Sequence, residues 1–121
     1  MAAWALFLAL FAALGGGCGS PAANHCPPTP SDPACPDAAP SFAQVVYPQV
    51  FQLSCVPCHS PGGQESNMPL TSYQQVAVRA GEIHNQVFLA CAMPPPGAAQ
   101  MLSDVQRQTL LDWLACAAPD N

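Results

Sequence analysis

The sequence predicts an all-α protein. Segments after residue 40 carry apolar residues at helical spacing, and several of them begin at helix-capping patterns. The two runs with strand character, residues 45–47 and 87–89, are too short to build a sheet. A chain of 121 residues is long enough for one small domain and no more.

The first helix is expected to begin at Pro48, because proline is favoured at the first helical position. A second helix is expected after Thr71, where Thr-Ser-Tyr-Gln has the spacing of a capping box, and Gly81 can end it. A third covers residues 82–91 and must stop before the three prolines at 94–96. The apolar residues on these three helices are Val50, Phe51, Leu53, Tyr73, Val76, Ala77, Ala80, Ile83 and Val87.

The last helix is the clearest, because Ser103-Asp-Val-Gln is a capping box with an acid in the first turn. We expect Met101, just before this helix, to be a core residue. The predicted apolar stripe consists of Leu110, Trp113, Leu114 and Ala117. The predicted polar face consists of Asp104, Arg107, Gln108 and Asp112.

The beginning of the chain has the pattern of an export signal. Residues 2–14 are an apolar run, followed by three glycines and Cys18, so we assign residues 1–17 to a signal peptide. The run is shorter than the roughly 20 apolar residues that span a bilayer, although an uncleaved anchor is the alternative. The segment Leu-Gly-Gly-Gly-Cys resembles a bacterial lipoprotein signal. This resemblance implies lipidation of Cys18 and a lipid anchor on the periplasmic side of a bacterial membrane, with ordinary cleavage nearby as the alternative.

Residues 18–40 are interpreted as a proline-rich linker. Seven of the 15 prolines lie there, and proline prevents helix and sheet from propagating. Such a segment would hold the remaining domain, residues 41–121, away from a membrane surface. A domain of this size usually needs disulfides, a metal or a large cofactor for stability.

The charge balance excludes nucleic acid as a partner. Two basic residues, Arg79 and Arg107, stand against seven acids, which gives a formal net charge of −5. Such a surface cannot neutralise a phosphate backbone. It suggests instead a protein partner with a basic patch.

The segment Cys55-Val-Pro-Cys58-His59 has the pattern by which haem c is attached. Two thiols at this spacing reach the two vinyl groups on one edge of the porphyrin, and the adjacent imidazole then lies on the iron axis. The alternatives are a redox dithiol, half of a zinc site and a disulfide. A zinc site would need a second paired cluster and a thioredoxin-like dithiol a βαβ context, and the sequence shows neither. We therefore predict one covalent haem c.

A six-coordinate haem iron needs a second axial ligand, for which we predict Met93. This residue lies in a proline-rich segment, and a stiff loop holds a ligand with little loss of conformational freedom. Met68 lies only nine residues beyond His59, a short path to the opposite face of the ring. His84 is the main competing ligand, and an iron with an open site is the other alternative.

Residues 42–121 resemble a small monohaem cytochrome c of the type found in planctomycete and myxobacterial secreted proteins. The resemblance rests on Cys55–His59 and on Met93-Pro-Pro, and more loosely on Phe42 and on residues 46–48, 70–73, 102–103, 113–114 and 117. It implies a class I cytochrome fold, in which the first and last helices cross and the haem edge is partly exposed. The glycine usual beside the histidine is Ser60 here. The carbonyl that orients the ring of His59 therefore stays open, with Pro61 and Pro69 as candidates.

Four cysteines remain after lipid and haem are assigned. Cys91 lies two residues before Met93, and Cys116 lies in the last turn of the final helix. A bridge between them would pin the ligand loop to that helix, and the resembling cytochromes imply this pair. Two buried free thiols are the alternative. Within the linker, Cys26 and Cys35 could form a second bridge.

These assignments predict an electron carrier that exchanges one electron with other redox proteins, and not an enzyme. Two axial ligands from the protein leave no place for a substrate, and methionine sulfur raises the potential relative to two histidines. If Met93 does not bind, an open iron would suit a haem c sensor or a peroxidase-like site. A disulfide-stapled lipoprotein that binds no haem and acts as a binding module is the third hypothesis. The residues expected around the ring are Phe51, Val76, Val87, Leu110 and Trp113.

Overall fold

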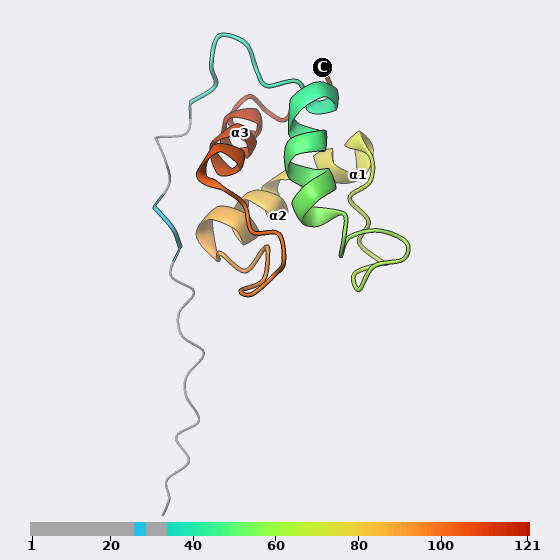
Figure 1. Ribbon diagram of the computed structural model, residues 1–121. Helices are drawn as coiled ribbons and strands as arrows, with labels where there is room; N and C mark the ends of the chain where they lie inside the picture. The colour runs from blue at the N-terminus through green and yellow to red at the C-terminus, as the bar shows by residue number, and fades with distance from the viewer. Residues whose placement is uncertain (1–25, 29–33) are drawn as a thin grey trace, which may run out of the picture.

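The computed structural model describes residues 26–28 and 34–121, and this part of the chain is helical without a strand. In chain order the elements are η1 (Phe42–Cys55), α1 (Tyr73–Ala77), α2 (Ala80–His84), η2 (Asn85–Leu89) and α3 (Asp104–Ala115) (Figure 1). The all-α prediction is therefore confirmed. The predicted signal peptide, residues 1–17, and Cys18 lie outside the described residues. No helix in the described part is long and apolar enough to cross a bilayer.

Helix η1 begins at Phe42, so the predicted start at Pro48 was wrong. Its cap is Ser41, whose Oγ accepts a hydrogen bond from the backbone N–H of Gln44. Hydrogen bonds in this helix reach back five residues, as from the N–H of Val46 to the Ser41 carbonyl (2.9 Å). This wider turn eases the clash between a proline ring and the carbonyl four residues earlier, so the helix accommodates Pro48 in its interior.

The middle helices, α1 and α2, begin and end at other residues than the sequence predicts. Ser72, and not Thr71, caps α1, since Ser72 Oγ accepts from the N–H of Gln75 (3.4 Å). Gly81 does not end this helix: a break at Arg79 (φ −111°) separates α1 from α2, which runs through the glycine. Because α2 continues directly into η2, the two together form the segment predicted at residues 82–91.

Helix α3 begins where the sequence predicts. Ser103 Oγ accepts from the N–H of Gln106 (3.2 Å), and the Gln106 side chain accepts from the N–H of Ser103 (2.8 Å). The helix ends at Ala115, so Ala117 lies beyond it and is exposed, contrary to the predicted stripe. Leu111 takes a buried place on the stripe instead, at 2% exposure.

Two residues near α3 were assigned to the wrong environment. Met101, predicted in the core, lies in the loop before the cap and is 54% exposed. Arg107, predicted on the polar face, is only 6% exposed. Its guanidinium lies 5.0 Å from the centre of the Phe88 ring, and its Nη1 donates to the Val87 carbonyl (3.4 Å). The aromatic face and the carbonyl at the end of η2 stabilise this charge in part. Its Nε and Nη2 are buried without a hydrogen-bond partner among the described residues.

Aromatic side chains join η1 to α3, and these two helices lie side by side (Figure 1). Trp113 is fully buried, with its ring centre 6.2 Å from that of Phe51 and 5.4 Å from that of Phe42. The last residue of the chain closes this arrangement, because Asn121 Oδ1 accepts from the N–H of Phe42 (3.0 Å). The N-terminus of η1 and the C-terminus of the chain are thereby fixed together.

Disulfides fasten the linker to the helical domain in a pairing that the sequence analysis did not predict. Cys26 bonds to Cys91 and Cys35 to Cys116, with Cα–Cα distances of 5.3 and 4.7 Å. The predicted Cys91–Cys116 and Cys26–Cys35 pairs are therefore wrong, although all four cysteines are bonded. The entropic cost of closing a loop rises only slowly with its length, so spacing along the chain could not select the partners. Among the described linker residues, Cys26 and Cys35 are therefore tied covalently to the domain.

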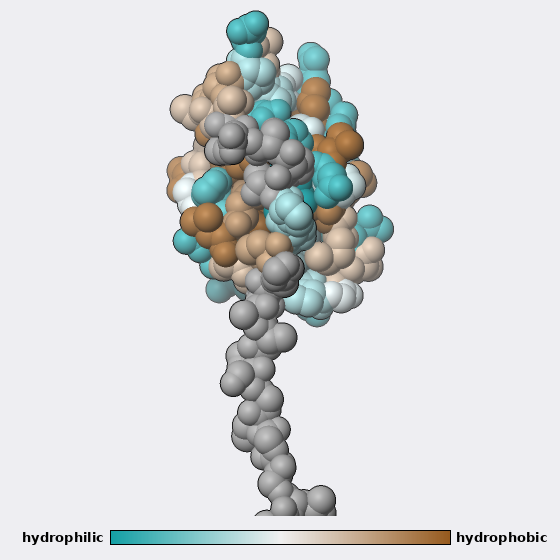
Figure 2. Space-filling view, turned by 90° about the vertical axis from the view of Figure 1, so that its left-hand side faces the viewer, coloured by the Kyte–Doolittle hydropathy of each residue, from teal (hydrophilic) through white to brown (hydrophobic). Residues whose placement is uncertain are grey.

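The face of the molecule shown in Figure 2 has no sharp division between apolar and polar areas. Hydrophobic and hydrophilic residues are interspersed on this face. Several large apolar side chains are half exposed or more: Leu53, Val78, Leu89, Met101 and Val105. Scattered exposure of this kind is normal for a soluble domain.

Candidate functional site

A cavity of about 330 Å³ opens between the end of η1, the loop that follows it, the α2–η2 segment and the loop before α3. Its size falls within the range of cofactor and small-molecule sites, about 300–1,000 Å³. Cys55, Cys58, His59 and Met93, the four predicted haem contacts, all line it. The apolar part of the lining consists of Phe51, Leu70, Ile83, Val87, Leu102 and Leu110. The other two predicted ring contacts, Val76 and Trp113, are buried in the core and do not line the cavity.

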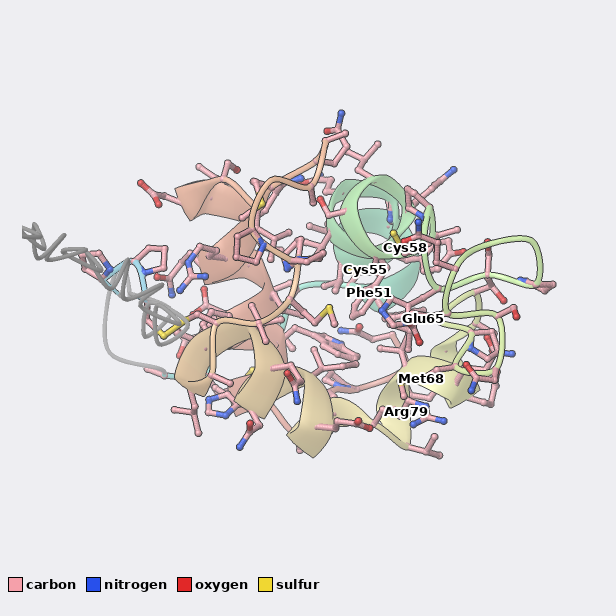
Figure 3. All side chains as sticks on the ribbon, turned by 90° about the horizontal axis from the view of Figure 1, so that it is seen from below. Phe51, Cys55, Cys58, Glu65, Met68 and Arg79 are labelled. Carbon is pink, nitrogen blue, oxygen red and sulfur yellow. A yellow bond between two sulfur atoms is a disulfide. The ribbon has the colours of Figure 1, made fainter. Side chains whose placement is uncertain are left out.

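The end of η1 and the turn after it position Cys55, Cys58 and His59. Figure 3 labels the two cysteines. The backbone N–H groups of Cys58 and His59 both donate to the Cys55 carbonyl, at 3.1 and 2.9 Å. These bonds continue the helical turn beyond η1, so Cys55 and His59 lie one turn apart. The chain then reverses tightly, with the N–H of Gly63 donating to the Ser60 carbonyl (2.9 Å).

The ring of His59 is oriented by a backbone carbonyl. Its Nδ1 lies 3.0 Å from the carbonyl oxygen of Met68, so the candidates Pro61 and Pro69 were wrong. A carbonyl can only accept a hydrogen bond, so Nδ1 carries the hydrogen and Nε2 of the neutral ring keeps its lone pair. The N–H of Leu70 donates to the His59 carbonyl (2.9 Å) and holds the two segments together. This second contact explains the choice of acceptor, because it sets the register that brings Met68 beside the ring.

Within the described residues, the two cysteines of the motif form no disulfide with each other or with another cysteine. Burial, together with a smaller contribution from the neighbouring Cys58, raises the pKa of the Cys55 thiol from 9.0 to about 12. Catalytic dithiols instead have a thiolate stabilised by a lowered pKa. The surroundings of Cys55 therefore do not suit a redox dithiol.

Among the candidate axial ligands, the structure places only two at the cavity besides His59. Met93 lines it from the loop before α3, with 38% of its surface exposed, and Met68 lines it from the loop that holds the His59 ring. Met101 does not line it. His84 lies instead at a separate hollow between α2 and α3, with its ring 5.6 Å from that of Phe88.

Polar side chains at the cavity were missed by the sequence analysis. They are Gln64, Glu65, Arg79, Glu82 and Gln86. Figure 3 shows Arg79 across the cavity from Cys55, and its Nη1 donates to Glu82 Oε2 at 3.2 Å. A helical stripe could have revealed this wall, because residues 79, 82, 83, 86 and 87 follow the spacing i, i+3, i+4, i+7 and i+8. Its mixed polarity concealed the pattern.

The donor set at the cavity fits a covalently attached haem. It offers two unbonded thiols, an imidazole nitrogen with a free lone pair, a thioether sulfur and an apolar wall. The hydroxyl of Ser54 also lines the cavity, buried and without a hydrogen-bond partner among the described residues. Within those residues, no group of three or more histidine, cysteine or acidic side chains is placed to hold a metal ion.

Comparisons with known proteins provide no assignment for this site. No protein-family model matches the chain, and no curated protein or solved structure is significantly similar to it.

Proposed function

We propose that this protein binds one haem c covalently and transfers single electrons. The observation that supports the proposal most is the convergence of Cys55, Cys58, His59 and Met93 on one cavity. Such convergence is not implied by the Cys-x-x-Cys-His pattern, because Met93 comes from a different loop. The haem, when bound, supplies an iron that alternates between the ferric and ferrous states.

The residues of the chain have distinct roles in this proposal. Cys55 and Cys58 form the thioethers, and His59 binds the iron through Nε2 while the Met68 carbonyl holds its Nδ1–H. Met93 would provide a sulfur ligand to the iron, and such a ligand favours the ferrous state. The apolar lining excludes water and disfavours the more charged ferric site, so both effects raise the potential.

The cellular setting belongs to the same proposal. Export to the periplasmic side of a bacterial membrane, with a lipid on Cys18, would place the carrier beside membrane-bound or soluble redox proteins. Two disulfides agree with an oxidising compartment. A Cys18→Ser variant should then lose lipid labelling and appear in the soluble fraction, whereas retention in the membrane would contradict the anchor.

Absorption spectra test the proposal directly. The chain is expressed with haem-maturation machinery, and we expect pigment that stays with the polypeptide on a denaturing gel. A Cys55→Ala/Cys58→Ala variant should lose it. If the wild-type chain carries no covalent pigment, and if the Cys55→Ala/Cys58→Ala variant folds as well as the wild type, the binding module without haem is favoured instead.

The axial ligand is tested by methionine variants. We expect Met93→Ala to lose the weak red charge-transfer band of ferric methionine–iron ligation. Met101→Ala is the matched control, because Met101 is exposed and lies outside the cavity. A high-spin ferric spectrum already in the wild type would favour the second candidate function, a haem c sensor or peroxidase-like site. The 38% exposure of Met93 is the observation in its favour.

A further inference from the structure

We propose that the Cys26–Cys91 disulfide is a positioning device for the ligand loop, defined as residues 90–103, and that it keeps Met93 at the iron. The inference rests on the proposed function and adds a role for two residues outside the cavity, Cys26 and Cys91. Cys91 lies two positions before Met93 and is bonded to a linker residue 65 positions earlier in the chain. The disulfide therefore joins the linker to the ligand loop directly beside the predicted ligand.

The backbone at Cys91 has to be held in place. Its φ is 50°, a left-handed conformation that residues other than glycine adopt at a cost. The next two N–H groups, of Ala92 and Met93, both donate to the Gln86 carbonyl, at 2.8 and 3.2 Å. Gln86 itself lines the cavity. The turn at Cys91 therefore fixes where the loop enters the site.

The disulfide lies against the end of η2, where the loop begins. Cys26 Sγ is 3.3 Å from the Leu89 carbonyl oxygen, and Cys91 Sγ is 3.5 Å from the Val87 carbonyl oxygen. The buried guanidinium of Arg107 donates to the same Val87 carbonyl from α3. The last turn of η2 is thus held from two directions, by α3 and by the linker.

Beyond Met93 the loop has few backbone hydrogen bonds, although Leu102 near its end packs against the core. Between Met93 and Ser103, the described part of the chain has a single backbone hydrogen bond outside the helices, from Ala98 to Pro95, and both residues belong to the loop. Met93 itself is 38% exposed, so packing alone holds it only in part. The disulfide and the Gln86 carbonyl are therefore the restraints nearest to the ligand.

The second disulfide provides a matched control. It closes a stretch of 81 residues, compared with 65 for Cys26–Cys91, so chain entropy predicts nearly equal effects on stability. It bonds Cys35 to Cys116, just past the end of α3, and neither cysteine belongs to the ligand loop. A difference between the two variants would therefore report on position and not on stability.

The experiment compares the haem-loaded Cys26→Ser/Cys91→Ser and Cys35→Ser/Cys116→Ser variants. The readouts are the ferric methionine–iron band and the rate of cyanide binding, which requires Met93 to leave the iron. We expect the first variant to bind cyanide about tenfold faster than the wild type. This factor corresponds to the conformational entropy that the backbone of one residue regains when a restraint is removed. The second should stay within about twofold of the wild-type rate, because its loss leaves the loop restrained.

Equal rates in the two variants, whether both are unchanged or both are faster, would overturn the proposal. If the first variant does not fold, the folded wild-type protein is reduced with dithiothreitol instead, its opened thiols are alkylated, and the haem iron is reoxidised with ferricyanide before the spectrum is recorded. Mass spectrometry identifies which disulfide has opened. Loss of the band must then follow opening of Cys26–Cys91, and its persistence would again refute the positioning role. Absence of covalent haem in the wild type would refute the proposed function, a result distinct from any of these.

Discussion

Gly63 is the position where one added methyl group should do the most damage to the site. An alanine Cβ at this position would lie 2.1 Å from the carbonyl oxygen of Cys58 and 2.6 Å from its carbonyl carbon. Ordinary Cβ contacts are 3.4 Å or longer. Both groups are backbone, so no side-chain rotation relieves the overlap. The same carbonyl accepts a hydrogen bond from the N–H of Glu65 (3.0 Å), which is lost if the chain moves away.

The cost can be estimated from these two terms. Overpacking of this kind costs about 1–3 kcal/mol, and backbone against backbone belongs at the upper end. The lost hydrogen bond adds about 1 kcal/mol. We therefore expect Gly63→Ala to lower the free energy of unfolding by about 3–4 kcal/mol. For a domain of this size that corresponds to a fall of roughly 15–25 °C in Tm.

Gly62→Ala is the control, because a Cβ there meets nothing within 4 Å and the backbone is not left-handed. It should stabilise by up to about 1 kcal/mol, since alanine restricts the unfolded chain. Thermal and urea unfolding followed by circular dichroism measure both variants. The yield of covalent haem should fall in Gly63→Ala alone, because Cys58 is displaced. If the free energies of unfolding of the Gly63→Ala and Gly62→Ala proteins differ by less than about 1 kcal/mol, the reasoning is refuted.

Four further predictions follow from local contacts. Before haem is attached, the contribution of Cys55 to the free energy of unfolding should be constant below pH 9 and should fall between pH 9 and about 12, because the thiol loses its proton first in the unfolded chain. Urea titrations at several pH values should show that Cys55→Ala flattens this decline. An unchanged slope would contradict the raised pKa. At pH 8, Cys55 should resist iodoacetamide in the folded chain and react in urea, as read by peptide mass spectrometry. Ser103→Ala should cost about 1 kcal/mol by removing the cap of α3, and Ser103→Gly only a few tenths; equal losses would indicate that the hydroxyl does not cap. Trp113→Phe should cost about 2 kcal/mol in urea unfolding, since it loses buried volume and the hydrogen bond from Nε1 to the Pro119 carbonyl (3.0 Å), and a neutral effect would mean that the core repacks.

The sequence predicted best what depends on neighbouring residues. The capping box of Ser103 and Gln106 places the start of α3 correctly, because both partners lie within one turn. The helical class follows in the same way from apolar spacing. The start of η1 was missed although Ser41 and Gln44 have the spacing of a cap, since Pro48 gave a stronger local signal that the wider turn of η1 overrides.

Contacts between distant segments could not be predicted from the sequence. Arg107 is spaced as a surface residue, yet the ring of Phe88 and the end of η2 cover it. The acceptor for His59 depends on how the loop after the motif folds back, and Met68 and Pro69 are equally plausible by distance along the chain. Near misses of this kind arise because backbone carbonyls carry no sequence signature.

The sequence by itself determined the helical class, the cap of α3 and the four residues proposed to contact haem, since each is written in short spacings between residue types. Only the tertiary structure decided that Met93 reaches the cavity of Cys55 and His59 while His84 does not, and that the linker cysteines bond to the domain. The physical reason is that closing a long loop costs little more than closing a shorter one, so packing, and not separation along the chain, selects which distant residues meet.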